Sequence, residues 1–149
     1  MNKSILFVCL GNICRSPLAE AIFNHRAKEL GLAWRSDSCG TANYHVGDLP
    51  DERTIFVAQK NGMAMDHRGR QFSESDFELY DLILAMDASN YRNILRVGSQ
   101  EFHHKVKMLR DFDPQGRGDV PDPYYGTHRD FDEVFEILDR SIRNLLVEL

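Results

Sequence analysis

The chain lacks the long apolar segments that mark membrane proteins. No apolar run approaches the roughly 20 residues that a helix needs to span a bilayer. The first three residues lead directly into a predicted strand, without the apolar region and cleavage site of a signal peptide. We therefore expect a cytoplasmic protein with no membrane insertion.

Cysteine is also scarce. Cys9, Cys14 and Cys39 are too few for a disulfide framework, which is consistent with a reducing compartment. They lack the paired C-x2-C spacing of a zinc site, and an arginine lies among them. We expect neither a disulfide-stapled fold nor a metal site.

Positive charge is in deficit, with 18 lysine and arginine residues against 23 aspartate and glutamate residues and a net charge of -5. This balance argues against a general binder of nucleic acid or of anionic membranes, so any anion site must be local. The 149 residues are 42% hydrophobic and contain no internal repeat or low-complexity segment. They predict a single domain over residues 1–149.

One stretch, residues 8–17 with the sequence VCLGNICRSP, joins an apolar segment to a helix. Residues 3–8 are rich in strand formers, and Pro17 suits the first helical turn, where its missing N–H is not needed. The loop between strand and helix should aim its backbone N–H groups at one spot, aligned with the positive end of the helix dipole. Such a spot is an anion site.

The side chains of this loop suit transfer of a phosphoryl group to sulfur. A helix N-terminus and a nearby guanidinium favour the thiolate form of a cysteine, which makes Cys9 a candidate nucleophile. Arg15 offers a planar fork of donors for two phosphate oxygens. Ser16 can hydrogen-bond the thiolate, and Gly11 permits close approach of the backbone or a positive φ.

The spacing Cys9-x5-Arg15-Ser16 is the signature of cysteine-dependent phosphatases, and the string from Cys9 to Pro17 resembles the low-molecular-weight protein tyrosine phosphatases closely. The resemblance covers essentially the whole chain. It implies that the phosphate is bound by the residues of this loop, namely Leu10, Gly11, Asn12, Ile13, Cys14, Arg15 and Ser16.

The rest of the chain alternates strands with helices, which indicates an α/β fold with a parallel sheet. We predict strands at residues 3–8, 34–39, 81–86 and 105–109, and helices at residues 17–30, 49–62, 87–97 and 130–149. The resemblance adds a strand order of 2-1-3-4 with helices on both faces and the phosphatase loop between strand 1 and helix 1. That order reverses beside strand 1, where a crevice should open at Cys9. Asp87, after the third strand, either lies near this crevice or caps the next helix.

Residues 110–128 form the longest predicted loop and contain the sequence DVPDPYYG. Prolines on both sides of Asp122 restrict the backbone, so its carboxylate can be held at a defined place. The resemblance implies that Asp122 is the general acid and that Tyr124 and Tyr125 flank the aromatic ring of the substrate.

The resemblance also assigns supporting residues. Tyr44 and His45 are expected in the wall of the substrate cleft. For His45, a position in a solvated loop without a role in the cleft is an equally good interpretation. His67 is expected to bond Asn12 and Ser16 of the phosphate loop and so to hold that loop in shape.

These residues predict a protein tyrosine phosphatase that works in two steps through a phosphocysteine, with no cofactor. Its expected partners are phosphotyrosine-containing proteins and a tyrosine kinase whose action it reverses, with inorganic phosphate or other oxyanions as competitive ligands. Ile13 argues against an arginine phosphatase, because arginine phosphatases of this family carry threonine there. A second alternative is a redox-responsive phosphate-binding protein without turnover, in which Cys9 and Cys14 form a disulfide.

Overall fold

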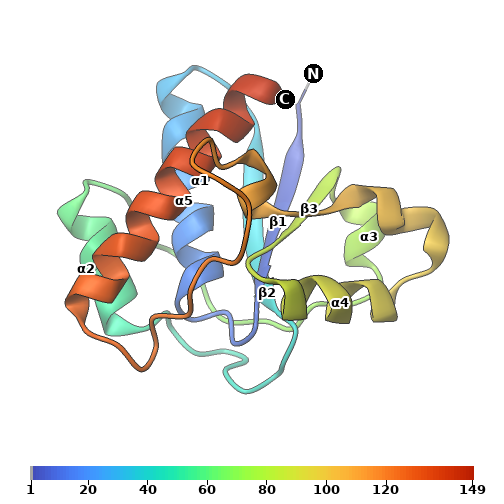
Figure 1. Ribbon diagram of the computed structural model, residues 1–149, viewed down its shortest axis with the longest axis horizontal. Helices are drawn as coiled ribbons and strands as arrows, with labels where there is room; N and C mark the ends of the chain where they lie inside the picture. The colour runs from blue at the N-terminus through green and yellow to red at the C-terminus, as the bar shows by residue number, and fades with distance from the viewer. Residues whose placement is uncertain (1) are drawn as a thin grey trace.

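A four-stranded parallel sheet forms the centre of the computed structural model, which describes residues 2–149 (Figure 1). Its order is β2-β1-β3-β4, as predicted. The strands are β1 (Ser4–Cys9), β2 (Arg35–Gly40), β3 (Leu82–Ala85) and β4 (Val106–Met108). The helices are α1 (Arg15–Glu29), α2 (Glu52–Lys60), α3 (Asp76–Leu79), α4 (Ala88–Val97) and α5 (His128–Glu148), with 3-10 helices at Gln100–Lys105 and Leu109–Phe112.

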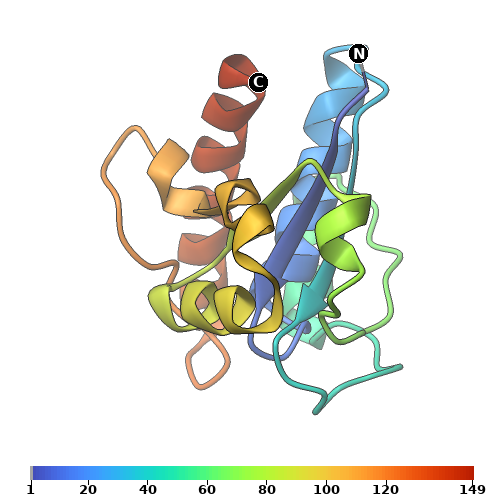
Figure 2. The ribbon, with the colours of Figure 1, turned by 90° about the vertical axis from the view of Figure 1, so that its right-hand side faces the viewer.

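Helices cover both faces of the sheet, which confirms the predicted fold class. In Figure 1 α1, α2 and α5 lie on one side of β1, and α3 and α4 lie on the other; Figure 2 views the molecule from the α4 side. Because successive side chains of a strand point to opposite faces, β1 contributes to both layers. Ile5 and Phe7 pack in the core with α1 and α5, while Leu6 and Val8 pack in the second core with α3 and α4.

The predicted elements are all present, with ends that shift by a few residues. The largest change for the site is that α1 begins at Arg15, so Pro17 is the third residue of the helix and not the first. Pro17 still lies in the first turn, where no intrahelical partner for an N–H exists. None of the helices within residues 2–149 is both long and apolar enough to cross a membrane.

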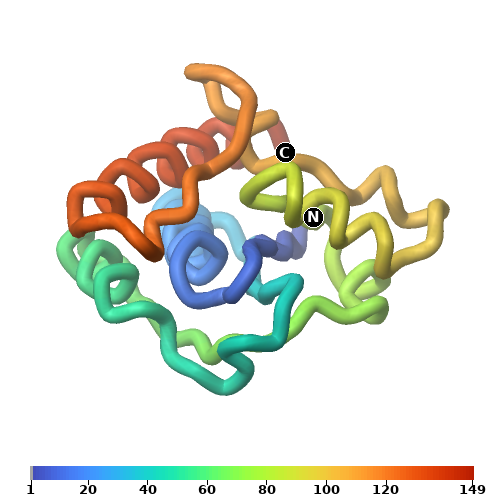
Figure 3. The backbone as a smooth tube through the Cα atoms, turned by 60° about the horizontal axis from the view of Figure 1, so that its bottom comes forward, coloured from blue at the N-terminus to red at the C-terminus, as the bar shows by residue number. Residues whose placement is uncertain are grey.

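The end of β1 lies where the order of the parallel strands reverses, because β2 was added on one side of β1 and β3 on the other. β1 pairs with β2 on one side and with β3 on the other, and Cys9 lies opposite Gly40 in the β2 register. Three loops meet beside this end. They are the Cys9 loop (residues 10–14), named after the residue that precedes it, the Tyr44 loop (residues 41–51) and the Asp122 loop (residues 113–127). Figure 3 shows the Cys9 loop between the other two.

The Asp122 loop is tied to the core at its beginning by Asp113, whose side chain is fully buried. The carboxylate accepts hydrogen bonds from Arg110 Nε at 2.9 Å and from Arg140 Nε of α5 at 2.8 Å. Burial raises the pKa of Asp113, but the bonds from Arg140, the Gln115 N–H and Arg110 outweigh it and leave this pKa lowered. The carboxylate therefore stays charged inside the fold.

We expect Asp113→Ala to lower the free energy of unfolding by roughly 3 kcal/mol at pH 7, because it strands two partly buried guanidinium groups. Urea denaturation measures this loss. Since the pKa of Asp113 is lowered in the folded state, its contribution is present above the ordinary carboxyl pKa of about 4 and fades as the pH falls below it.

A surface ion pair supplies the control. Lys60 Nζ lies 2.6 Å from Asp132 Oδ1, and both side chains are 46% exposed. Asp132→Ala should therefore lower the free energy of unfolding by no more than about 1 kcal/mol. Equal losses in the two variants would contradict the assigned role of Asp113.

Candidate active site

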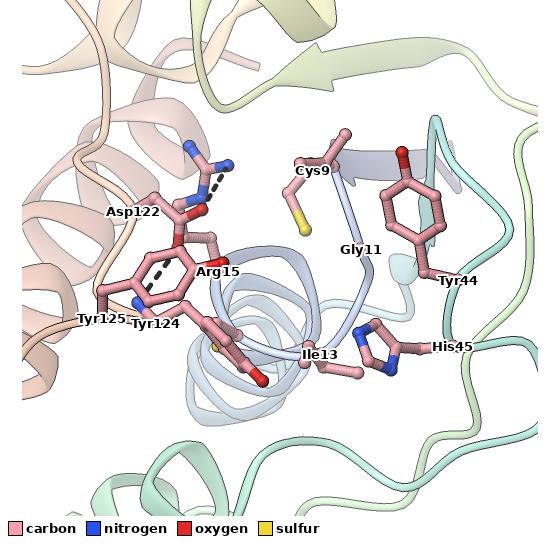
Figure 4. Close-up of a pocket in the computed structure, with 11 residues that line it drawn as sticks. Cys9, Gly11, Ile13, Arg15, Tyr44, His45, Asp122, Tyr124 and Tyr125 are labelled. Atoms are coloured by element: carbon pink, nitrogen blue, oxygen red, sulfur yellow. Dashed lines mark hydrogen bonds and ion pairs between the residues drawn. The ribbon is translucent and has the colours of Figure 1, made fainter.

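A cavity of about 320 Å³ opens between the three loops (Figure 4). It brings together side chains that the sequence separates by more than one hundred residues. The lining consists of Cys9, Leu10, Gly11, Ile13, Cys14, Arg15, Tyr44, His45, Asp122, Tyr124 and Tyr125. The three residues expected to be catalytic and the five expected in the cleft wall therefore share one cavity.

Cys9 ends β1, and its sulfur points into the cavity (Figure 4). The Sγ atom accepts a hydrogen bond from the Asn12 N–H at 3.2 Å and lies 3.0 Å from the Ser16 hydroxyl, which can donate to it. Two hydrogen-bond donors therefore face the sulfur. The surroundings of Cys9 thus suit a nucleophile that becomes a leaving group later in the reaction.

Arg15 is the first residue of α1, and its side chain is only 3% exposed. Nη1 donates to Asp87 Oδ2 at 2.7 Å and to the Val120 carbonyl at 2.9 Å, which fixes the plane of the guanidinium. Burial lowers the pKa of Arg15, but negative charge at Cys9, Asp87 and Asp122 outweighs it and raises this pKa. Arg15 is therefore a permanent cation held beside the sulfur.

Asp87 fills both of the roles that the sequence left open. Its Oδ1 accepts from the Asn90 N–H at 2.8 Å as the N-cap of α4, while Oδ2 binds Arg15. One carboxylate therefore starts a helix and orients the cation of the cavity.

Asn12 gives the Cys9 loop its shape. Its φ of 58° is the only positive value at a non-glycine residue in the part of the chain that the structure describes. Nδ2 donates to Ser16 Oγ at 2.8 Å and to Ser38 Oγ at 3.0 Å. Oδ1 accepts from His67 Nε2 at 2.7 Å and from the Arg70 N–H at 3.1 Å. Four bonds thus hold a backbone conformation that non-glycine residues rarely adopt.

Gly11 therefore does not supply the left-handed residue of the loop. It provides space instead: a Cβ atom at Gly11 would lie 3.2 Å from Cδ2 of His45. The His45 ring packs against the Cys9 loop, and its Nδ1 lies 3.1 Å from Asp48 Oδ2. His45 belongs to the cavity wall and is not simply a solvated loop residue.

His67 supports the loop differently from the expectation. It bonds Asn12 directly but reaches Ser16 only through Asn12. Its Nδ1 lies 3.0 Å from Glu20 Oε1 and 3.6 Å from Asp37 Oδ1. The sequence did not predict the supporting residues Glu20, Asp37 and Ser38, because no local pattern links them to the Cys9 loop.

The same His67 cluster has ligand types that metals use. One ring nitrogen and two carboxylate oxygens, from Glu20, Asp37 and His67, lie within 4.8 Å of one another. However, Glu20 Oε1 already accepts from Ser38 Oγ at 2.7 Å, and Asp37 Oδ2 accepts from Arg70 Nε at 3.1 Å. These partners favour a hydrogen-bond network that braces Asn12.

Asp122 faces the cavity from the Asp122 loop with its side chain 45% exposed. Oδ1 accepts from the Tyr124 N–H at 3.1 Å, while Oδ2 lies 3.9 Å from Arg15 Nη2. The rings of Tyr124 and Tyr125 pack edge to face with centroids 4.9 Å apart. Tyr125 is 94% exposed and Tyr124 39%, so Tyr124 forms the wall and Tyr125 the rim.

Arg53 of α2 anchors this loop, and sequence reasoning missed it. Its guanidinium donates to the carbonyls of Tyr124 at 2.9 Å and of Gly126 at 3.1 Å. It also pairs with Asp51, whose N–H donates to the Ile13 carbonyl at 2.8 Å. The start of α2 therefore ties the Cys9 loop to the Asp122 loop.

Cys14 lines the same cavity as Cys9 but differs from it in environment. Burial, together with negative charge at Asp51 and Cys9, raises the pKa of Cys14 to about 12, so it stays a neutral thiol at neutral pH. All three cysteines of the chain are free.

Comparison with known proteins identifies close relatives of this arrangement. A family model described as "Low molecular weight phosphotyrosine protein phosphatase" matches residues 4–149. The low molecular weight phosphotyrosine protein phosphatase of Schizosaccharomyces pombe is 47% identical over 138 residues, which cover 90% of this chain and 88% of the relative.

Solved structures agree with this match. A protein tyrosine phosphatase from Entamoeba histolytica superposes with a TM-score of 0.95 at 38% identity, covering 98% of this chain and 96% of that one. The arginine phosphatase YwlE, solved as a cysteine-to-serine mutant with a phosphorylated active-site serine, superposes with a TM-score of 0.90 at 28% identity, covering 98% and 95%.

Proposed function

The chain belongs to the low molecular weight phosphotyrosine protein phosphatase family and is a cysteine-dependent protein tyrosine phosphatase, and we propose that Cys9, Arg15 and Asp122 carry out its reaction. The observation that supports this assignment is their convergence on one cavity from the end of β1, the start of α1 and the Asp122 loop. The whole chain, residues 1–149, acts as one catalytic domain in this proposal.

In the first step, the Cys9 thiolate attacks phosphorus and Arg15 holds two oxygens of the transferring group. The buried guanidinium and the loop N–H groups are positioned before reaction, so they stabilise developing charge without reorganisation. Asp122, in its protonated form, gives a proton to the departing phenolate oxygen. The partial exposure of Asp122 at the cavity mouth suits contact with a leaving group.

In the second step, Asp122 takes a proton from a water molecule that attacks the phosphocysteine, and sulfur leaves as the thiolate. The Ser16 hydroxyl and the Asn12 N–H stabilise that leaving group, because both contact Sγ. YwlE carries its phosphoryl group on the serine that replaces a cysteine, which supports covalent transfer to the side chain at this position.

The cavity walls support phosphotyrosine as the group bound. Ile13, Tyr44 and Tyr124 offer apolar and aromatic surface on which a phenyl ring can pack. The relative that is 47% identical is named a phosphotyrosine phosphatase, whereas the arginine phosphatase is 28% identical. We therefore propose phosphotyrosine as the substrate group and keep phosphoarginine as the alternative. The substrates are phosphotyrosine-containing proteins, one of them a tyrosine kinase, and inorganic phosphate competes for the cavity.

A cytoplasmic location is part of the proposal, because a catalytic thiolate needs a reducing compartment. In the same way we propose that Cys14 guards Cys9. Under peroxide the two thiols are oxidised to a disulfide while one peroxide is reduced to two waters, and a reductant reverses the change.

Cys9→Ser is expected to abolish hydrolysis of a phosphotyrosine peptide while keeping inorganic phosphate binding, because the anion site does not need sulfur. Steady-state assays and calorimetric titration measure the two properties. As a control, Cys39→Ala removes a buried thiol that does not line the cavity and should keep turnover. Hydrolysis by Cys9→Ser at the wild-type rate would refute the nucleophile.

Asp122→Asn is expected to lower kcat by about 100- to 10,000-fold on phosphotyrosine, where a proton must reach a basic phenolate. The loss should be smaller with p-nitrophenyl phosphate, whose leaving group needs less protonation. Asp119→Asn, in the same loop but hydrogen-bonded to the Ala88 N–H, is the matched control. A loss below about 10-fold on both substrates would point to another acid.

Peroxide treatment is expected to inactivate the enzyme through a Cys9–Cys14 bridge, which peptide mapping by mass spectrometry detects. Activity should return with dithiothreitol. Cys14→Ser should lose this recovery, because Cys9 then oxidises further. Inactivation of the wild type without a Cys9–Cys14 disulfide would contradict the proposed protection of Cys9 by Cys14.

A further inference from the structure

A second cavity, of about 420 Å³, adjoins the active site on the other side of Leu10 and Tyr44. Both residues line the two cavities, so the wall between them is a single layer of side chains. We call this second cavity the α4 pocket, since the last turns of α4 form one side of it. It is lined by Leu10, Thr41, Ala42, Tyr44, Gln71, Phe72, Asn93, Arg96 and Val97.

The α4 pocket carries positive charge without an acidic partner. Arg96 is exposed, and its Nη1 donates to Oδ1 of Asn93, another residue of the pocket, at 2.9 Å. Neither Arg96 nor Arg92, one turn earlier, forms an ion pair with any residue that the structure describes. In a chain with a net charge of -5, Arg96 in the pocket and Arg92 on the same helix face outside it make a local region of positive potential.

A buried hydroxyl of the pocket also lacks a partner. Thr41 Oγ1 is one of two buried side-chain polar atoms without a hydrogen bond among residues 2–149. An unmade hydrogen bond at a buried group costs free energy. Because Thr41 Oγ1 has almost no exposed surface, a ligand in the pocket gains this bond only when the Thr41 side chain turns toward it. The accessible surface of the site therefore combines the cation of Arg96 with apolar walls from Leu10 and Val97.

We propose that the α4 pocket binds an acidic side chain of the substrate protein, one to three residues from the phosphotyrosine. This inference rests on the proposed function and names a feature of its substrates. An extended chain advances roughly 3.3 Å per residue, so a neighbour of a phosphotyrosine in the active site can cross a wall one side chain thick. Aspartate and glutamate match the planar guanidinium of Arg96 geometrically.

The first test compares three phosphotyrosine peptides that carry glutamate, alanine or lysine at one flanking position, scanned over three positions on each side. At one position at least, kcat/KM should be about 5-fold or more higher with glutamate than with lysine. The preference should shrink at 0.5 M salt, because the pair is exposed. Equal kcat/KM values at every position would overturn the proposal.

The second test reverses the charge of the pocket. Arg96→Glu should remove or invert the preference for glutamate while p-nitrophenyl phosphate hydrolysis stays within about 2-fold of wild type. Arg35→Glu is the control for net charge, because Arg35 is exposed at the start of β2, outside both cavities. A preference that survives in Arg96→Glu, or is lost equally in Arg35→Glu, would overturn the assignment.

Binding without turnover separates the two proposals. Fluorescence anisotropy of labelled peptides with Cys9→Ser reports the glutamate preference even if the wild type hydrolyses nothing. Hydrolysis without a glutamate preference rejects the α4 pocket and leaves the phosphatase assignment intact. A preference in binding with no hydrolysis by the wild type would reject the proposed reaction and support the pocket.

Discussion

The active site depends on the four hydrogen bonds that hold Asn12 in a left-handed conformation. Such a conformation costs free energy for a residue with a Cβ, and here the amide side chain offsets that cost through Ser16, Ser38, His67 and the Arg70 backbone. The turn at Asn12 brings its own N–H to the Cys9 sulfur. The proposed anion site thus depends on backbone shape, and the surrounding side chains maintain that shape.

A second constraint is electrostatic. Burying the Arg15 cation would be costly if it were alone, but Asp87, the Val120 carbonyl and the Cys9 sulfur surround it. Asp87 is itself held at the end of β3, where it caps α4. The charge of the cavity therefore lies at the ends of the sheet and its helices, whereas the proposed acid Asp122 lies on a loop.

The Asp122 loop needs its own anchors, since loops have few contacts with the core. Asp113 ties its beginning to α5 through Arg140, and Arg53 ties its end to the start of α2. These anchors explain how a half-exposed carboxylate keeps a defined distance from Arg15. They also couple the Asp122 loop to the Cys9 loop, because Arg53 pairs with Asp51, whose N–H donates to the Ile13 carbonyl.

Local sequence determined the strands, the helices, the Cys9 loop and the Pro-flanked position of Asp122, because propensity, hydrophobic period and motif spacing depend on neighbours in the chain. It also indicated the strand order through resemblance. Only the tertiary structure decided that Asn12 rather than Gly11 takes the positive φ, that His67 acts through Asn12, and that Asp87 serves both α4 and Arg15. It also placed Arg53 against the Asp122 loop and formed the α4 pocket. These features join residues far apart in the chain, and a side chain's distant partner is set by the path of the backbone, which no local pattern encodes.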